Sequence, residues 1–339
     1  MVRTIKLKRK YHRGDHKEAL YRVTLFRPLG VYPRGTFCTP TGLFHADEEI
    51  VFATTYGPTW SASIETLPYS EVDWLLPEAV RLLGSLILTE QSSEGLRCGF
   101  YPLSHGHFIL DERHVDLTVP ATALAVKKAL LKTVGNLLWD KWVQERWEAC
   151  LGQEFFLFDP AEELSIEMLP RYWERFSTDN HVLMRGMQAL IKSDMLARHG
   201  EFQEEGAIAT FIALDASFQL VLRHLRANGN PNPSAKDAGD WLYKTFDEPL
   251  GVNGAEGMKY FESFYDQRVQ TVHPASRFGD MPYAPVMVDD RIHLRQCLPE
   301  VFAYTLLGEH APSFWREVAE RKERWSRPVP PCSGMTEEY

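Results

Sequence analysis

An arginine and a histidine five positions apart, Arg268 and His273, are the residues of this chain best suited to act on a phosphodiester. Arginine can grip a phosphate through two hydrogen bonds, and histidine can take or give a proton near neutral pH. The pair therefore predicts metal-free cleavage of a phosphodiester. The structural alternative is a surface arginine followed by a histidine that is stabilised by the dipole at a helix C-terminus.

A helix is expected to carry this pair, because residues 257–272 repeat apolar side chains at intervals of three and four. These side chains are Phe261, Phe264, Tyr265, Val269 and Val272. Pro274 disfavours helical backbone at His273, so the helix should end there. Two positions five apart on an ideal helix point about 140° from each other. Either the last turn loosens, or a second copy of the helix supplies the complementary groups.

Asp215 interrupts the apolar stripe of another expected helix, which spans residues 204–227. The stripe consists of Ile208, Phe211, Ile212, Phe218, Leu222 and Leu225. A buried carboxylate without a partner costs several kcal/mol or becomes protonated. Asp215 therefore serves either as a structural partner for a backbone or arginine group, or as the carboxylate that orients Arg268 or His273.

The order of motifs in the second half resembles the HEPN domain in its ApeA-like branch, over about residues 180–310. A first helical segment around Met184-Arg185-Gly186-Met187 precedes an acidic pair, Glu204-Glu205. A second segment then carries Ala213-Leu214-Asp215-Ala216, and a third carries Tyr265-Asp266-Gln267-Arg268-Val269-Gln270-Thr271-Val272-His273. The chain departs from the family pattern at Val269, where a polar residue is frequent, at Pro274, where glycine is common, and at Asp215, where glutamate is frequent.

The resemblance implies a homodimer in which two Arg–His motifs line one cleft and cleave RNA without a metal or other cofactor. His273 would act as general base or acid, Arg268 would stabilise the phosphorane, and Asp266, Gln270 and Thr271 would support them together with Asp215. It further implies a role in phage defence or toxin-like growth arrest, with the N-terminal region or a regulatory protein restraining the nuclease. The alternative is an inert HEPN module that serves dimerisation or binds a nucleotide or partner protein.

Whole-chain composition is typical of a soluble globular protein: 339 residues, 44% hydrophobic, 24% charged, with a net charge of −9. Neither a membrane-spanning run nor a signal peptide is expected, which predicts a cytoplasmic protein. The five scattered cysteines argue against a disulfide framework and a cysteine-built zinc site. Local basic patches matter more for RNA than net charge, so Lys8, Arg9 and Lys10 are weak RNA-binding candidates. The alternative for this segment is an edge strand protected by lysines.

The first half is expected to be mixed and rich in strands, which makes the fold class α+β. Strands are predicted at 22–26 and 49–54 and as a pair within 96–117, with helices at 77–88 and 121–149. His105 and His107 alternate along one expected strand, so they could hold a metal ion together with His114 or Asp111. The alternative is a hairpin that is simply rich in polar residues.

The chain divides into four predicted parts. Residues 1–120 form a mixed α/β region, 121–178 a helical connector, 179–312 a HEPN-like helical bundle, and 313–339 a C-terminal tail. Besides the helix before His273, the bundle should contain helices at 181–198, 204–227 and 290–308, the last with a kink or restart at Pro299.

Overall fold

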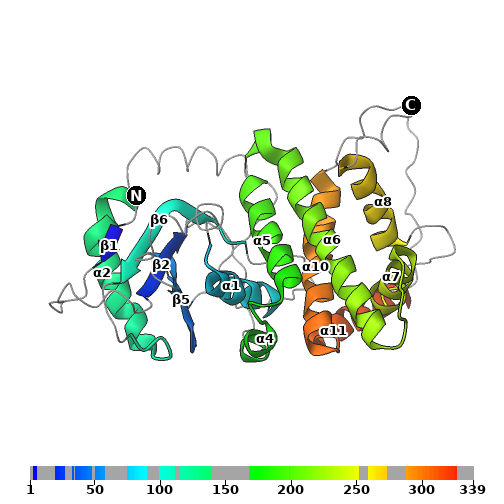
Figure 1. Cartoon of the computed structure of the whole chain (residues 1–339), viewed down its shortest axis with the longest axis horizontal. Helices are drawn as coiled ribbons and strands as arrows, with labels where there is room; N and C mark the ends of the chain where they lie inside the picture. The colour runs from blue at the N-terminus through cyan, green and yellow to red at the C-terminus, as the bar shows by residue number, and fades with distance from the viewer. Residues whose placement is uncertain are drawn as a thin grey trace, which may run out of the picture.

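A strand-rich first half and a helical second half make up the protein, which confirms the α+β class (Figure 1). The computed structural model describes residues 3–5, 20–26, 33, 35–47, 50–57, 75–89, 99–110, 115–138, 168–197, 199–251, 259–272 and 288–326.

The first half is built on a six-stranded sheet with the order β1-β6-β2-β5-β4-β3. The strands are β1 (Arg3–Ile5), β2 (Leu20–Phe26), β3 (Gly35–Thr39), β4 (Gly42–Ala46), β5 (Val51–Gly57) and β6 (Pro102–Leu110). Neighbours are antiparallel except β1, which runs parallel to β6 at one edge. The predicted strands at 22–26 and 49–54 are confirmed. In place of the strand pair expected within 96–117, the described residues form β6, which pairs with β1 and β2.

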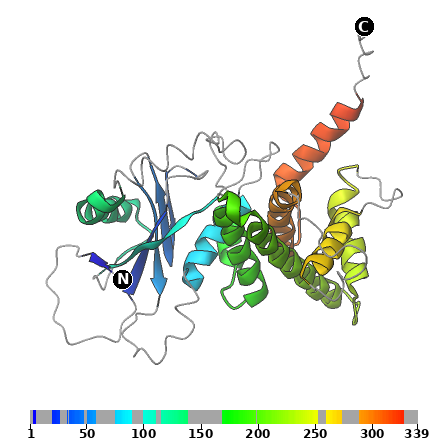
Figure 2. The same ribbon diagram turned by 90° about the horizontal axis from the view of Figure 1, so that it is seen from above.

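Two helices cover the two faces of this sheet (Figure 2). Helix α2 (Pro120–Leu138) packs Ala123, Val126 and Leu130 on one face, against strand residues that include Val23 and Leu25. Helix α1 (Pro77–Thr89) covers the opposite face. Each face has its own set of core side chains, because successive side chains of a strand point to opposite sides of the sheet.

Helix α1 joins the sheet to the helical half. Every residue from Leu82 to Thr89 is buried, as expected for a helix that is covered on all sides. The side of α1 that faces away from the sheet packs against helix α4 (Leu169–Arg175) and against the bundle behind it. At Gly84 the backbone comes so near that an added Cβ would lie 2.5 Å from the Phe176 ring. A single hydrophobic core therefore runs from the sheet through α1 into the bundle.

Four helices of the bundle were predicted, two of them (α6 and α8) from apolar periodicity: α5 (His181–Leu196), α6 (Gln203–Ala227), α8 (Tyr260–Val272) and α10 (Val288–Leu307). The Asn180 side chain caps α5 by accepting the Leu183 N–H at 3.3 Å. A short 3-10 turn, η2 (Gly200–Phe202), leads into α6, and Gly229, at a φ of 98°, follows its end. Helix α10 continues through Pro299 without a restart.

Three further elements that follow α6 were not predicted. Helix α7 (Ala235–Leu242) begins at a capping box between Ser234 and Asp237 and continues into a π-helical turn, η3 (Tyr243–Asp247). Helix α11 (Pro312–Ser326) occupies most of the region that the sequence assigned to a tail. Its Phe314 and Val318, four residues apart, are buried, so this helix is attached to the core.

One stretch of the described residues, Gly200–Ala227, is long and apolar enough to span a membrane. It contains α6, and 67% of its most apolar window is buried inside the protein. A central helix of a bundle has this composition because its neighbours surround it.

Candidate functional site

Arg268 lies on α8 beside a carboxylate of α6. The two helices are brought together by Phe218 and Tyr265, whose rings stack with centroids 4.4 Å apart. One turn further along α8, Arg268 Nη2 lies 3.2 Å from Asp215 Oδ1. The guanidinium carbon is also 5.7 Å from the centre of the Tyr265 ring, a cation–π distance. The structure thus pairs the two charged residues that the sequence singled out on these helices.

The pair lies at a partly open surface. The exposed fraction of the Arg268 side chain is 18%, and that of Asp215 is 36%. Ion pairs that water reaches contribute about 0–1 kcal/mol to stability. The main effect of Asp215 is therefore to fix the direction of the Arg268 guanidinium. Asp215 lies within the apolar stripe of α6 but is not fully buried, so it is more exposed than its position in the stripe predicts.

The remaining motif positions have different environments. Thr271 is buried, Val269 is half-buried and Asp266 is exposed. Gln270 belongs to α8, but the structure does not describe its side chain. Helix α8 ends at Val272, as the following Pro274 predicts. His273 itself lies outside the described residues, so its position relative to Arg268 stays a prediction.

The weaker site predictions fall mostly outside the described part of the chain. Lys8, Arg9, Lys10, Asp111 and His114 all lie beyond it. His105 and His107 belong to β6, but their side chains are not described. Among the residues that the structure does describe, no group of three His, Cys, Asp or Glu side chains is placed to hold a metal ion.

A buried ion pair between α5 and α10 was missed by sequence reasoning. Arg295 Nε donates to both Asp194 oxygens at 2.9 and 3.0 Å, and Nη2 donates to Oδ2 at 2.8 Å. Both side chains are at most 7% exposed, so this pair binds the two helices together and does not face substrate. The sequence did contain one signal. Asp194 follows Leu190 by four residues and Ile191 by three, so a charged side chain lies on the buried face of the helix. Its partner is 101 residues away in sequence.

A second polar cluster links α2 to the sheet. The His45 ring bonds to Thr36 Oγ1 at 2.8 Å and to Asp47 Oδ2 at 2.9 Å. Hydroxyl, imidazole and carboxylate in this order are the ingredients of a hydrolase triad. Here, however, Lys127 of α2 also binds Asp47 at 2.6 Å, and His45 is buried between the layers. The cluster accordingly anchors a helix.

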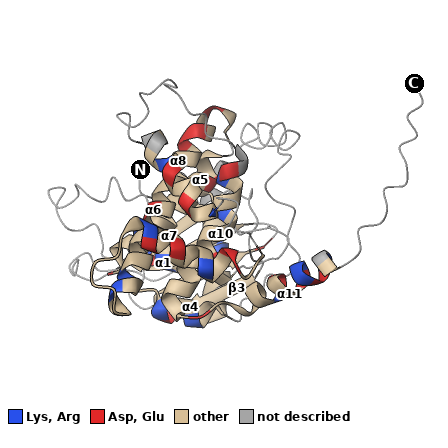
Figure 3. Cartoon of the chain, turned by 90° about the vertical axis from the view of Figure 1, so that its right-hand side faces the viewer, with Lys and Arg blue, Asp and Glu red and all other residues tan. Residues whose placement is uncertain are grey.

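Charge around α8 is predominantly acidic. Helix α8 carries Glu262 and Asp266 beside Arg268, and Figure 3 shows several Asp and Glu positions on the ribbon around α8 and α5. A nucleic acid that approached this end would meet a negative potential except at local cations. Within α8, Arg268 is the only Lys or Arg, so a phosphate bound at this helix would depend on its guanidinium.

The chain matches no protein-family model, no curated protein and no solved structure.

Proposed function

We propose that this protein is a metal-independent endoribonuclease of HEPN type. The observation that carries the proposal is the Arg268–Asp215 pair at 3.2 Å, because it joins two separate motifs of the resemblance across facing helices. The family order of motifs falls on α5, α6 and α8, in that sequence. An arginine oriented by a carboxylate at a partly open surface can receive a phosphate.

The proposed reaction needs only the RNA and protein side chains. The ribose 2′-oxygen attacks the neighbouring phosphorus while His273 takes its proton. Arg268 stabilises the charge that builds up on the phosphorane oxygens. The bond from phosphorus to the 5′-oxygen then breaks, a protonated imidazole supplies the proton, and the products are a 2′,3′-cyclic phosphate and a 5′-hydroxyl. DNA is not cleaved because it has no 2′-hydroxyl.

The working unit in this proposal is a cytoplasmic homodimer. Arg268 and a residue five positions later point in different directions on one ideal helix, so a second copy of α8 would complete each site. Two copies would also bring two guanidinium groups into an acidic region. In this proposal the enzyme acts in phage defence or growth arrest, and the N-terminal region or a regulatory protein restrains it.

One observation favours the alternative, a non-catalytic HEPN module. The Asp215 carboxylate already forms an ion pair with the Arg268 guanidinium, and its negative charge lowers the attraction of Arg268 for phosphate. The half-buried Val269, where the family often has a polar residue, points the same way. Such a module would serve dimerisation or bind a nucleotide or partner protein.

The deciding experiment is cleavage of single-stranded RNA by the purified full-length protein in EDTA. We expect Arg268→Ala and His273→Ala each to lower the rate by about 10²- to 10⁴-fold, the range for loss of a charge stabiliser or a proton-transfer group. The matched controls are Arg226→Ala and His181→Ala, which alter exposed residues of the same types on α6 and α5. The proposal is supported if the wild type and both controls produce cyclic phosphate ends and the Arg268→Ala and His273→Ala variants do not. Equal rates from all five proteins, or cleavage that EDTA abolishes, contradict it.

A further inference from the structure

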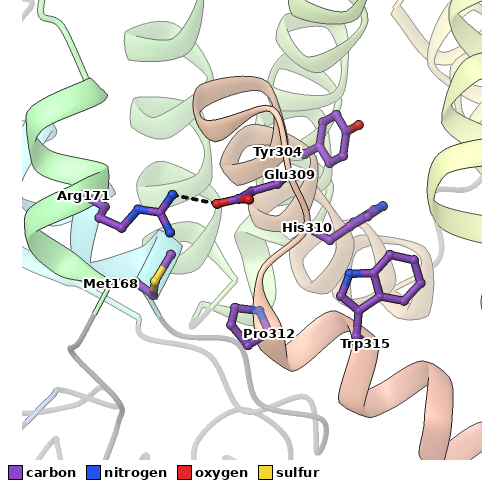
Figure 4. A pocket seen from close by; sticks show the side chains of 7 residues that line it. All are labelled: Met168, Arg171, Tyr304, Glu309, His310, Pro312 and Trp315. Atoms are coloured by element: carbon purple, nitrogen blue, oxygen red, sulfur yellow. Dashed lines mark hydrogen bonds and ion pairs between the residues drawn. The ribbon is translucent and has the colours of Figure 1, made fainter.

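A cavity of about 600 Å³ lies where α4 meets the end of α10 and the start of α11 (Figure 4). Met168 and Arg171 form its wall on the α4 side. Tyr304 of α10, His310 of the loop before α11 and Trp315 of α11 also line it. Cavities that hold small ligands in proteins have volumes of about 300–1,000 Å³, so this one has the size of a ligand site.

The aromatic residues that line the cavity contact one another in one cluster around His310. The His310 ring stacks on Phe314 with centroids 3.9 Å apart and planes at 7°. Trp315 and Tyr304 contact His310 edge-on, at 5.2 and 4.8 Å. Phe314 is buried and anchors the group, whereas 53% of Trp315 is exposed. The exposed part of Trp315 is therefore available to a planar ring, and the contacts with His310 and Phe314 support Trp315 from behind.

The rim of the cavity carries a weak ion pair. Arg171 Nη2 lies 2.6 Å from Glu309 Oε1, and both side chains are more than half exposed. Water and salt weaken such a pair, so a competing anion can displace the carboxylate from the guanidinium. Pro312 lines the cavity at the first turn of α11, a helix of 15 residues. The N-terminal end of a helix of this length also favours an anion.

His310 adds a neutral ring to the cavity. Burial lowers its pKa to about 4, and a hydrogen bond with the Thr245 backbone only partly opposes this shift. At neutral pH the imidazole is therefore uncharged and can stack on a base without electrostatic preference. Arg171 is left as the positively charged side chain among the residues that line the cavity.

We propose that this cavity binds a nucleoside phosphate. The base stacks against Trp315 and the neighbouring rings, and the phosphate replaces Glu309 on Arg171. The ligand is either a free nucleotide or the terminal nucleotide of an RNA strand, since both present the same chemistry. The site is distinct from Arg268, because α8 lies at the upper end of the bundle in Figures 1 and 3 and α11 at the lower end.

The charges also define the rival ligand, a quaternary ammonium held by the aromatic rings and Glu309. The two ligands respond in opposite ways to the loss of Glu309. Removing this carboxylate frees Arg171 and tightens the binding of a phosphate, but it weakens the binding of a cation. The sign of this single change therefore decides between them.

The test is calorimetric titration of the full-length protein with 5′-AMP, 5′-CMP, a 5′-phosphorylated RNA trinucleotide and choline. We expect Trp315→Ala to weaken nucleotide binding about 5- to 150-fold, the range for the loss of base stacking on one aromatic ring. Trp315→Phe, which keeps a ring, should retain most of the affinity. Arg171→Gln should weaken nucleotide binding and Glu309→Gln should strengthen it several-fold. All three side chains are at least half exposed, so melting temperatures should stay close to that of the wild type.

Binding of the mononucleotides with these effects supports a free nucleotide. Binding of the trinucleotide alone, with the same dependence on Trp315, supports the end of an RNA strand. Absence of both at millimolar concentration, an unchanged affinity in Trp315→Ala, or choline binding that Glu309→Gln removes each overturns the proposal. Titration of the Arg268→Ala variant separates this site from the proposed nuclease site, because binding in the cavity should survive that change. A protein without nuclease activity can still bind here.

Discussion

Among single side chains, the Arg268 guanidinium is fixed from two directions. The Asp215 carboxylate lies 3.2 Å from Nη2 on one side, and the ring of Tyr265, on the same helix as Arg268, lies on the other. Both neighbours come from positions that the HEPN resemblance includes in its motifs. Such a contact contributes little to stability but holds a long, flexible side chain in one of its many rotamers.

If Asp215 orients Arg268 for catalysis, Asp215→Asn should lower RNA cleavage by about 10- to 100-fold, because a displacement of about 1 Å costs that much in positioned reactions. Asp215→Glu should keep most of the activity, since it retains the charge and extends the reach. Initial rates at saturating RNA and the free energy of unfolding of each variant provide the measurement. An Asn variant that cleaves faster than wild type would mean that the carboxylate restrains the arginine.

A buried carboxylate elsewhere in the bundle, Asp247, makes stability depend on pH. It ends the π-helical turn η3, is 5% exposed, and receives a hydrogen bond from the Tyr260 backbone N–H. Burial raises its pKa from 3.8 to about 7. Between these values the folded protein keeps a proton that the unfolded chain has lost. The contribution to stability is therefore complete below pH 3.8 and disappears as the pH rises to about 7.

Asp247→Asn should remove this dependence, because an amide does not titrate. From pH 5 to pH 8 we expect the wild type to lose on the order of 2 kcal/mol more of its free energy of unfolding than the variant. Urea denaturation at both pH values measures the difference. His310 has the opposite sign: its lowered pKa gives stability that is present above pH 6.5 and lost as the pH falls to about 4. It is present in both proteins, so it cancels in the comparison. Parallel pH profiles would exclude the role of Asp247.

Among the elements, close packing depends on glycines where helices meet. A Cβ at Gly84 of α1 would lie 2.5 Å from Phe176 and 3.1 Å from Met187. At Gly186 of α5 it would lie 2.7 Å from the ring of Phe302 on α10. Both glycines sit inside helices, where the residue itself costs about 1 kcal/mol relative to alanine. Their presence is explained by the close approach of the neighbouring elements.

Gly84→Ala should therefore destabilise the protein by about 1–3 kcal/mol, the usual cost of overpacking a core, despite its better helix propensity. Gly200→Ala is the matched control, because nothing lies within 4 Å of a Cβ there. Its effect should stay within about 0.5 kcal/mol. Chemical denaturation at one pH compares the three proteins. Equal stability of both variants would show that Phe176 moves aside without cost.

Elements with a long apolar period could be predicted from the sequence, and elements that depend on distant partners could not. Helix α6 has 25 residues and a continuous apolar stripe, so its bounds were correct to one residue. Helix α7 has only eight residues, too few for an apolar repeat to stand out, and the Ser234–Asp237 capping box marks its start. The weak signal of α11 is Phe314 and Val318 among many charged residues. Strand β1 is three residues long, and its partner β6 lies about 100 residues away.

The same rule applies to the sites. Arg268 and Asp215 could be selected because each stands in a recognisable local pattern, and the structure places them together. The cavity beside α4 could not be predicted, since Arg171 and Glu309 are 138 residues apart and no local pattern relates them. The buried Asp194–Arg295 pair was missed for the same reason, because its two residues are 101 positions apart.

At the scale of the whole molecule, α1 is the feature with the widest consequence. Its residues complete the core of the sheet on one side and of the bundle on the other. Modules that recombine freely between proteins are joined where few contacts cross, usually by exposed linkers. Here a cut between the halves would leave either the sheet or the bundle with an uncovered apolar face. The shared core therefore makes the strand-rich half and the helical half one folding unit, and we expect neither to be stable when it is produced alone.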